Sequence, residues 1–355
     1  MPLRVGFDAG PLLEPHTGVG RYARELSLAL ATQGVEVRRY AVALRGKAGS
    51  DIKRLRLPAR TAQWAWRRFG KPGIGGLTGE IDVVHGTNFV LPALAGVPGV
   101  VTVHDLSFLR SDTFPGGDRL RSLVPWSLER AARVIVPTRA IAAELSDRWP
   151  RSEWTTTVVP EGVAPVFFGS GPLADSTLEG MGIRRPYVLA ASTVEPRKNL
   201  PRLLQAWSLA ADELAGWTLV IAGPRGWGPE LPRTQNTVLT GWVGDSTLPG
   251  LLSAAEIFCY PSLYEGFGLP PLEAMAAGTP VVAGRYSCSE EVLADAARVV
   301  EPTDVEALAK ALTELVSDRS LRQQLALAGR ARATHFTWDK AASQTLAVYE
   351  QAVSA

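Results

Sequence analysis

The sequence has few cysteines, no long uninterrupted apolar segment and no strong excess of charge of one sign. Only two cysteines, Cys259 and Cys288, occur among 355 residues, which excludes a disulfide-rich scaffold and predicts two reduced thiols. The stretch 86–103 carries no charge but contains two prolines and three glycines, so it predicts a loop and a strand rather than a membrane span. The net charge of +2 gives no indication of a nucleic-acid partner.

The length and the apolar content predict two domains, each with a core of its own. The 355 residues exceed the usual size of one domain, and 46% of them are hydrophobic,. Asp8 interrupts the first apolar run, so we expect no secretory signal at this end of the sequence. The expected location is cytoplasmic, with at most peripheral contact at the inner face of the membrane.

Residues 257–284 form the most informative stretch, because an apolar run, a glycine loop and a short helix follow one another. The run 257–260 predicts a buried strand, and Gly266 and Gly268 lie in the loop after it. The pair Pro270-Pro271 predicts the first turn of a helix, and Gly278 predicts its end. A helix start offers N–H groups without partners and the positive end of a dipole, so the stretch predicts an anion site.

Two carboxylates frame this loop. Glu265 precedes the glycines, and we expect Glu273 in the first turn of the helix. Carboxylates repel phosphate, so these two should accept hydrogen bonds from hydroxyl groups, and phosphate-binding amides beside them suit a nucleotide sugar. The alternative is an ordinary helix start with two acids that stabilise its dipole.

The segment after the expected strand 187–191 adds two cations. Arg197 and Lys198 stand between this strand and a helix expected to run through residue 211. Arg offers a planar fork and Lys a point charge, and together they suit a diphosphate. A basic surface turn is the alternative, and we favour phosphate binding because the glycine loop at 266–269 is also present.

The first half of the chain predicts a second parallel sheet. Strands at 3–7 and 35–42 flank a glycine loop at 17–20 and an amphipathic helix,,. His85 and His104 stand at the carboxyl ends of the strands 81–85 and 100–103, where ligands bind in such sheets,. We favour a structural role for His85.

Residues 53–71 are basic and aromatic, with no acid between Asp51 and Glu80. One interpretation is a segment that lies at a membrane surface. The other is a solvated helix face whose aromatic side chains point into the core, and the sequence leaves both open. The basic residues are Lys53, Arg54, Arg56, Arg60, Arg67, Arg68 and Lys71, and the aromatic ones are Trp64, Trp66 and Phe69.

The two glutamates with seven residues between them, around Gly-Phe-Gly-Leu-Pro, resemble the signature of the retaining nucleotide-sugar glycosyltransferases of family 4. The resemblance implies an α/β protein with the GT-B architecture, two Rossmann-like domains with the site in the cleft between them. It implies an acceptor domain at 1–168 and a nucleotide-sugar domain at 183–337. Residues 165–182 lack periodicity and contain several glycines and prolines, so the sequence itself predicts a linker there. A last helix within 338–355 would return to the first domain.

The resemblance also implies roles for single residues. Arg197 and Lys198 would stabilise the leaving diphosphate, Glu265 and His104 would bind the donor sugar, and Glu273 would bind the ribose. One departure is Ser192, because many members carry a second arginine there. The expected catalytic residues are thus His104, Glu265, Lys198 and Arg197, and the expected donor-binding residues are Gly18, Val243, Gly266, Phe267, Gly268, Leu269 and Glu273.

The expected activity is transfer of a hexose from a nucleotide sugar to a hydroxyl of a glycan or a lipid-linked acceptor, with retention of configuration. The stretches Val-His-Asp-Leu-Ser-Phe and Ser-x-Ser-Glu-Glu-Val resemble mannosyltransferases, and this resemblance favours mannose from GDP-mannose, while UDP-glucose, UDP-N-acetylglucosamine and dTDP-rhamnose stay open. No Asp-x-Asp occurs, and we expect neither a metal nor another cofactor. The alternatives are a nucleotide-sugar epimerase of the same fold and a non-catalytic nucleotide-sugar sensor.

Overall fold

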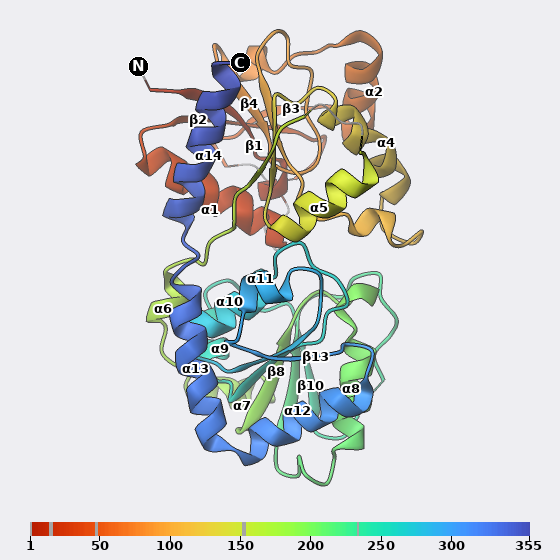
Figure 1. The fold of residues 1–355 in the computed structure, drawn as a ribbon, viewed down its shortest axis with the longest axis vertical. Helices are drawn as coiled ribbons and strands as arrows, with labels where there is room; N and C mark the ends of the chain where they lie inside the picture. The colour runs from red at the N-terminus through yellow and green to blue at the C-terminus, as the bar shows by residue number, and fades with distance from the viewer. Residues whose placement is uncertain (1, 14–16, 47–48, 151–153, 233) are drawn as a thin grey trace. The chain divides into compact units, whose positions relative to one another are not determined.

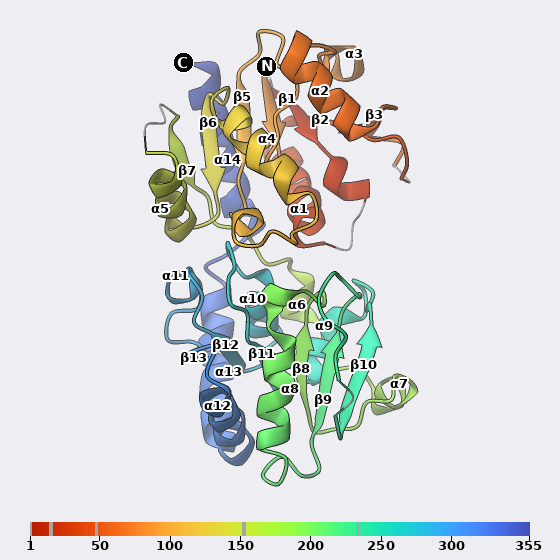
Figure 2. The same cartoon turned by 90° about the vertical axis from the view of Figure 1, so that its right-hand side faces the viewer.

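The structure, a computed structural model, describes residues 2–13, 17–46, 49–150, 154–232 and 234–355. The chain divides into two compact units, one formed by Met1–Gly162 together with Thr337–Ala355 and one formed by Val163–Phe336. Each unit contains one parallel β-sheet with helices packed on it (Figure 1 and Figure 2). The α/β class and the two Rossmann-like sheets predicted from the sequence are confirmed.

The first unit has a seven-stranded sheet in the order β3-β2-β1-β4-β5-β6-β7. The predicted strands are present within one or two residues, and the short edge strand β3 was not predicted. The strands are β1 (Arg4–Asp8), β2 (Glu36–Val42), β3 (Lys53–Leu55), β4 (Val83–Gly86), β5 (Gly99–Thr102), β6 (Arg133–Val136) and β7 (Thr156–Val158).

Helices of the first unit cover this sheet. The helix α1 begins at Gly18, so the expected glycine loop is shorter than predicted and Gly18 lies in the first turn. The cause is the side chain of Thr17, whose Oγ1 accepts a hydrogen bond from the amide of Gly20 at 3.0 Å and caps the helix,. The helices are η1 (Gly10–Leu13), α1 (Gly18–Thr32), α2 (Ala59–Phe69), α3 (Gly75–Thr78), η2 (Ser107–Leu109), α4 (Gly117–Leu128), α5 (Arg139–Arg148) and α14 (Trp338–Val353).

The last helix, α14, completes the core of the first unit. Its buried residues Trp338 and Tyr349 pack with α1 and with the strands β1, β4, β5 and β6. Both ring nitrogens of His85 form hydrogen bonds, Nδ1 with Tyr349 Oη at 2.6 Å and Nε2 with Thr102 Oγ1 at 2.8 Å. Burial lowers the pKa of His85 to about 3, so the ring is neutral and belongs to the core.

The second unit has a six-stranded sheet in the order β10-β9-β8-β11-β12-β13. Its strands are β8 (Tyr187–Ala191), β9 (Thr218–Ala222), β10 (Thr237–Gly241), β11 (Ile257–Tyr260), β12 (Val281–Gly284) and β13 (Arg298–Val300). Its helices are α6 (Val166–Gly169), α7 (Asp175–Gly180), η3 (Pro196–Lys198), α8 (Leu200–Leu209), α9 (Leu248–Ala254), α10 (Leu269–Ala276), α11 (Ser289–Leu293), α12 (Val305–Ser317) and α13 (Arg319–Ala333).

Side-chain alternation along β11 shows how this sheet is packed. Ile257 and Cys259 belong to the core cluster that α8 and α12 form on one face. Phe258 and Tyr260 therefore point to the opposite face, and α10 contacts both β11 and β12. Both cysteines of the chain are buried thiols outside any disulfide, as expected.

Residues 165–182 are not the irregular linker that the sequence predicted. They lie within the second unit and contain the two short helices α6 and α7. Phe167 and Leu178 anchor these helices, because each buries its side chain in the second unit. Glycines and prolines in this stretch limit each helix to one or two turns, which hid the helical period in the sequence.

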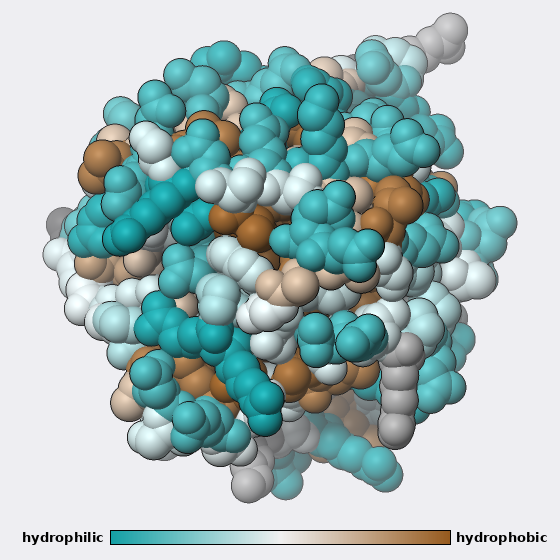
Figure 3. All heavy atoms as spheres, turned by 90° about the horizontal axis from the view of Figure 1, so that it is seen from below, coloured by the Kyte–Doolittle hydropathy of each residue, from teal (hydrophilic) through white to brown (hydrophobic). Residues whose placement is uncertain are grey.

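Hydrophilic side chains cover most of the face seen in Figure 3, and its apolar side chains stand in separate small groups. In the described part of the chain, no helix combines the length and the apolar character that crossing a bilayer requires.

Candidate active site

The sheet topology of the second unit points to one place for a ligand. The chain leaves β8 toward β9 on one side and leaves β11 toward β12 on the other, so the strand order reverses between β8 and β11. In parallel sheets, ligands bind beyond the carboxyl ends of the strands at such a switch point. The segments that follow these two strands contain Arg197 and Lys198 after β8, and Glu265 to Leu269 after β11.

The structure brings Arg197, Lys198 and Glu265 into direct contact. Lys198 Nζ donates to Glu265 Oε1 at 2.6 Å, and Arg197 Nη1 donates to Glu265 Oε2 at 2.6 Å. The hydroxyl of Tyr260, the last residue of β11, accepts from Lys198 Nζ at 2.6 Å and donates to Glu265 Oε1 at 2.9 Å. Each carboxylate oxygen of Glu265 therefore faces one cation.

A second acid balances the second cation. Glu195 Oε1 lies 2.6 Å from Arg197 Nε, and both Glu195 and Glu265 are buried. Glu195, Arg197, Lys198 and Glu265 together are called the ion cluster below. The two positive and the two negative charges of the ion cluster thus neutralise each other, as charges that are largely removed from water require.

The cluster sets the protonation of its members. Burial alone would raise the pKa of Glu265, but the charges of Arg197 and Lys198 outweigh it and hold this pKa at about 2. Burial, helped by Arg197, lowers the pKa of Lys198 against the opposing effect of Glu265. Glu265 is therefore a carboxylate at neutral pH. An ionised carboxylate has about four acceptor positions, so Glu265 can still accept from a ligand hydroxyl.

The loop 266–269 leads directly into α10. Gly268 precedes the helix with φ of +97°, a left-handed conformation that favours glycine,. Side chains that follow β12 hold the loop carbonyls. Ser287 Oγ donates to Glu265 O at 3.1 Å, and Cys288 Sγ lies 3.4 Å from the carbonyl oxygens of Glu265 and Phe267.

The position expected for Glu273 was wrong by one turn. The helix α10 already begins at Leu269, ahead of the two prolines, so Glu273 is its fifth residue and no acid lies in the first turn. The side chain of Glu273 is 2% exposed. Val243 follows β10, which β9 separates from β8 in the sheet, so Val243 lies farther along the sheet edge than the ion cluster.

His104 lies in the first unit, two residues after β5. Its Nε2 donates to the carbonyl of Thr87 at 2.8 Å, and its Nδ1 lies 3.1 Å from Glu161 Oε1. The ring of Tyr22 meets the imidazole edge to face, with centroids 4.6 Å apart. Burial would lower the pKa of His104, but the hydrogen bond and the charge of Glu161 raise it. Both ring nitrogens expected to meet a sugar are thus engaged within the first unit.

Sequence reasoning missed three polar partners of the expected residues, namely Glu161, Glu195 and Tyr260. Tyr260 and Glu161 follow or end strands, so their position at a carboxyl end was a usable signal. Glu195 stands two residues before Arg197, and a local acid was not recognised as a counter-ion.

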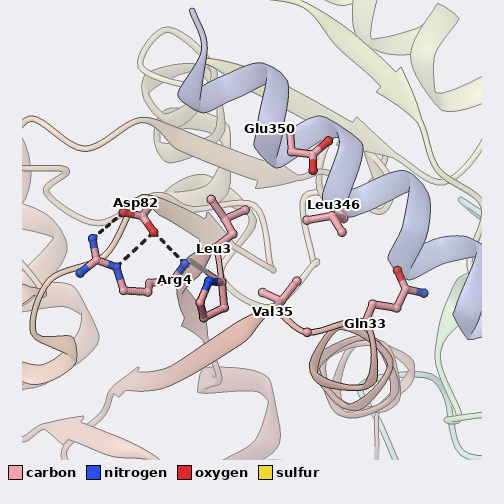
Figure 4. Close-up of a pocket in the computed structure, with 9 residues that line it drawn as sticks. Leu3, Arg4, Gln33, Val35, Asp82, Leu346 and Glu350 are labelled. Carbon is pink, nitrogen blue, oxygen red and sulfur yellow. Dashed lines mark hydrogen bonds and ion pairs between the residues drawn. The ribbon is translucent and has the colours of Figure 1, made fainter.

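A cavity of about 460 Å³ lies elsewhere, at the amino end of β1 (Figure 4). Arg4 and Asp82 form an ion pair at 2.7 Å on one side of it, and Leu346 and Glu350 of α14 lie on the other. This is the end of the sheet opposite to the ligand end, and it holds none of the expected site residues. Among the described residues, no group of three or more His, Cys, Asp or Glu side chains is arranged to bind a metal.

Comparison with known sequences identifies the family. The family described as Glycosyltransferase Family 4 matches residues 16–167, and the one described as Glycosyl transferases group 1 matches residues 182–332. The chain belongs to glycosyltransferase family 4. This family 4 glycosyltransferase is a hexosyltransferase, as the sequence predicted.

Two curated relatives of this family 4 enzyme are mannosyltransferases by name. The O-antigen chain mannosyltransferase B of Escherichia coli is 29% identical, with 98% of this chain and 100% of the relative covered. The MMP α-(1→4)-mannosyltransferase of Mycolicibacterium hassiacum is 33% identical, with 79% of this chain and 73% of the relative covered. Among solved structures, sucrose-phosphate synthase from Thermosynechococcus elongatus matches with a TM-score of 0.77 at 20% identity, covering 98% of both chains. The fold is GT-B.

Proposed function

We propose that this enzyme transfers mannose from GDP-mannose to a hydroxyl of a glycan or a lipid-linked acceptor, with retention of the anomeric configuration. The ion cluster at the switch point between β8 and β11 is the observation that carries the proposal, because it holds two cations ready for a diphosphate. The names of the two mannosyltransferase relatives support mannose as the sugar. GDP and retention rest on the sequence resemblance.

The main chemical task is to stabilise the diphosphate as it leaves. The bond between the anomeric carbon and the phosphate oxygen breaks, and negative charge grows on that oxygen. The acceptor's hydroxyl oxygen bonds to the anomeric carbon, and its proton passes to the leaving phosphate. Arg197 and Lys198 stabilise this charge, together with amides of the loop 266–269, in a site that excludes water. Their pairing with Glu195 and Glu265 keeps both cations fixed before the donor arrives, so little reorganisation is needed.

The remaining polar groups position the donor and the acceptor. We assign the donor-sugar hydroxyls to Glu265, the ribose hydroxyls to Glu273, the phosphate side to Gly18 and the border of the base to Val243. We assign His104, whose ring is held by Glu161 and Thr87, to the sugar. The second unit is the nucleotide-sugar domain and the first unit is the acceptor domain in this proposal.

The experiment is a donor panel with the purified protein. GDP-mannose, UDP-glucose, UDP-N-acetylglucosamine and dTDP-rhamnose are each incubated with candidate acceptors, and release of the nucleoside diphosphate is measured. We expect acceptor-dependent release with GDP-mannose and a product whose anomeric configuration, read by NMR, equals that of the donor. Epimerised donor without diphosphate release would establish an epimerase instead, and binding without any turnover would establish a sensor.

The segment 53–71 belongs to the first unit, the proposed acceptor domain, and exposes part of its aromatic and basic side chains. Trp66 is buried and donates to the carbonyl of Pro72 at 2.9 Å, whereas Trp64 and Phe69 stay exposed. The expectation that the aromatic side chains point into the core therefore holds for Trp66 and not for Trp64 or Phe69, and membrane contact stays a prediction. Trp64 lies with Arg60, Arg67 and Arg68 on one stripe of α2, at the spacing of one helix face,.

This stripe borders a groove between α2 and α4 of about 530 Å³, called the basic groove below. Four arginines and one aspartate line it, so an anionic occupant fits its charge. We propose that it seats on an anionic bilayer surface, which would bring the acceptor domain to a lipid-linked acceptor. The groove is lined by Arg60, Gln63, Trp64, Arg67, Arg68, Asp118, Arg119, Ser122 and Leu123.

A further inference from the structure

A buried hydroxyl without a hydrogen-bond partner lies beside the loop 266–269. Tyr286, two residues after β12, is 4% exposed, and its Oη has no hydrogen-bond partner among the described residues. Burial raises the pKa of Tyr286 well above its ordinary value, so the group stays a neutral O–H donor. A buried polar group left unpaired costs free energy and calls for an explanation.

The position of this hydroxyl is defined by Gly268. A Cβ atom added to Gly268 would stand only 2.8 Å from Tyr286 Oη, so the hydroxyl lies directly against the residue that precedes α10. The ring of Tyr286 meets the ring of Tyr260 edge to face, with centroids 6.3 Å apart. Tyr260 in turn bonds to Lys198 and Glu265. The orphan hydroxyl is therefore next to both the helix start and the ion cluster.

The start of α10 is poor in hydrogen-bond donors. Of its first three residues, Leu269, Pro270 and Pro271, only Leu269 has an N–H group, and no side chain caps the helix,. A helix start normally offers several free amides to an anion. An anion at this helix therefore needs a donor from another element, and the Tyr286 hydroxyl is in place to supply it.

We propose that Tyr286 Oη donates a hydrogen bond to a phosphate oxygen of the nucleoside diphosphate donor. The inference rests on the proposed function, because it assumes a diphosphate at the ion cluster. We expect the acceptor to be a phosphate oxygen rather than a sugar hydroxyl, because the cations Arg197 and Lys198 and the positive end of α10 meet beside the side chain of Tyr286. The loop 266–269 and Tyr286 would then hold the anion from two elements, α10 and the segment after β12.

The test is Tyr286→Phe, which removes one oxygen and keeps the ring. Binding of GDP and of GDP-mannose is measured by calorimetry, and the unfolding temperature is measured without ligand. We expect both affinities to fall by about tenfold or more, as for loss of a hydrogen bond to a charged group. The unfolding temperature should stay equal or rise, because the variant removes a hydroxyl that has no protein partner.

The matched control is Tyr187→Phe in the same unit. Tyr187 Oη donates to the carbonyl of Leu251 at 2.5 Å, and Tyr187 begins β8, at the end of the sheet away from the site. This variant should lower the unfolding temperature and leave the affinity for GDP unchanged. The two tyrosines thus separate a hydroxyl that serves the fold from one that serves the ligand.

Several outcomes would overturn the inference, and they can be told apart. Wild-type affinity for GDP in Tyr286→Phe rejects the hydrogen bond while the proposed function stands. Weaker binding of GDP-mannose with unchanged binding of GDP moves the contact to the sugar and rejects the phosphate. If the wild-type protein binds none of GDP, UDP and dTDP, the proposed donor class and the hydrogen bond are both rejected.

Discussion

Glu161 Oε1 lies 3.1 Å from Nδ1 of His104, while Nε2 of the same ring donates to the carbonyl of Thr87 at 2.8 Å. A neutral imidazole has a single N–H, so it can donate to only one of these oxygens. The protonated ring can donate to both, which is why Glu161 raises the pKa of His104 despite burial. The pair is therefore an ion pair whose existence depends on pH.

This geometry predicts a specific pH dependence of stability. The folded pKa of His104 is raised, so its contribution is fully present below the unfolded value of about 6.5 and is lost as pH rises through the folded value. Glu161→Gln should remove this part of the dependence, and urea unfolding across neutral pH measures it. Glu144→Gln, in the exposed pair with Arg110, is the control and should keep the wild-type slope. An unchanged slope in Glu161→Gln would contradict the ion pair.

Lys198 should matter more for turnover than for binding. In the proposed mechanism its ammonium meets the leaving diphosphate, whose charge is largest at the transition state, so Lys198→Ala should lower kcat by about 100-fold or more. KM for the donor should change much less. Steady-state kinetics measures both constants, with Lys310→Ala on the exposed side of α12 as the control. An unchanged kcat would remove Lys198 from the mechanism.

Glu273 should mainly affect nucleotide binding. Glu273→Ala removes a carboxylate that we assign to the ribose, and a charge-assisted hydrogen bond contributes about 1.5–3 kcal/mol. Affinity for GDP measured by calorimetry should therefore fall about tenfold or more. Because Glu273 is buried, Glu273→Gln is measured beside it, and an unfolding curve checks that each variant is folded. Wild-type affinity in both variants would reject the ribose assignment.

The order of strands and helices was predictable because its signals are local. The apolar run 257–260, the glycines after it and Gly278 each constrain the chain within a few residues, and β11 and α10 lie where they were expected. The strand ends could have marked Tyr260 and Glu161 as site residues, but no local signal pairs them with Lys198 and His104. Lys198 and Tyr260 are 62 positions apart, and His104 and Glu161 are 57 apart. Only the parallel sheet brings such residues together, and no pattern in the sequence states the pairing.

The start of α10 shows a second limit. The two prolines correctly indicated a first helical turn, but they did not say whether Leu269 already belonged to it. One residue of difference moved Glu273 from the first turn to the second. Likewise the basic and aromatic composition of this segment does not distinguish Trp64 from Trp66. Only the packing of α2 on Ala93 and Trp126 decides which of them is buried.

The basic groove predicts electrostatic binding to membranes. Arg67→Glu together with Arg68→Glu should weaken co-sedimentation with anionic vesicles by about tenfold or more, since each cation near such a surface contributes about 1 kcal/mol. Binding of the wild type should fall with added salt and be absent with neutral vesicles. The matched control is Lys310→Glu with Arg319→Glu, which changes the net charge equally in the second unit. If the wild type stays in the supernatant with anionic vesicles at low salt, the acceptor is better sought among soluble glycans.

We expect that replacing Asp8, whose carboxyl is buried, by asparagine stabilises the protein. It ends β1, and burial raises its pKa to about 6 against the effect of the Gly10 amide, which donates to Oδ1 at 2.8 Å. A raised carboxyl pKa means that stability is present below the unfolded value and lost as pH rises through about 6. Asp8→Asn keeps the acceptor for Gly10 and should raise the free energy of unfolding near neutral pH by about 1–2 kcal/mol.

The control for Asp8→Asn is a carboxyl whose pKa is shifted in the opposite direction. The side chain of Arg39 holds the pKa of Asp51 below its usual value, so Asp51→Asn should destabilise near neutral pH or have no effect. Urea unfolding at neutral and at acidic pH measures both variants. Equal stability of Asp8→Asn and the wild type at neutral pH would show that the carboxyl carries no penalty there.

The return of α14 to the first unit affects the order in which the two units can complete their cores during synthesis. Residues 2–162 leave the ribosome well before Trp338, Ala342 and Tyr349, which fill their core. Tyr349 also supplies the partner of the buried His85. The second unit, by contrast, is continuous from Val163 to Phe336 and has its whole sequence available earlier. During synthesis the first unit must therefore wait for α14, and the second unit can reach its native core before it.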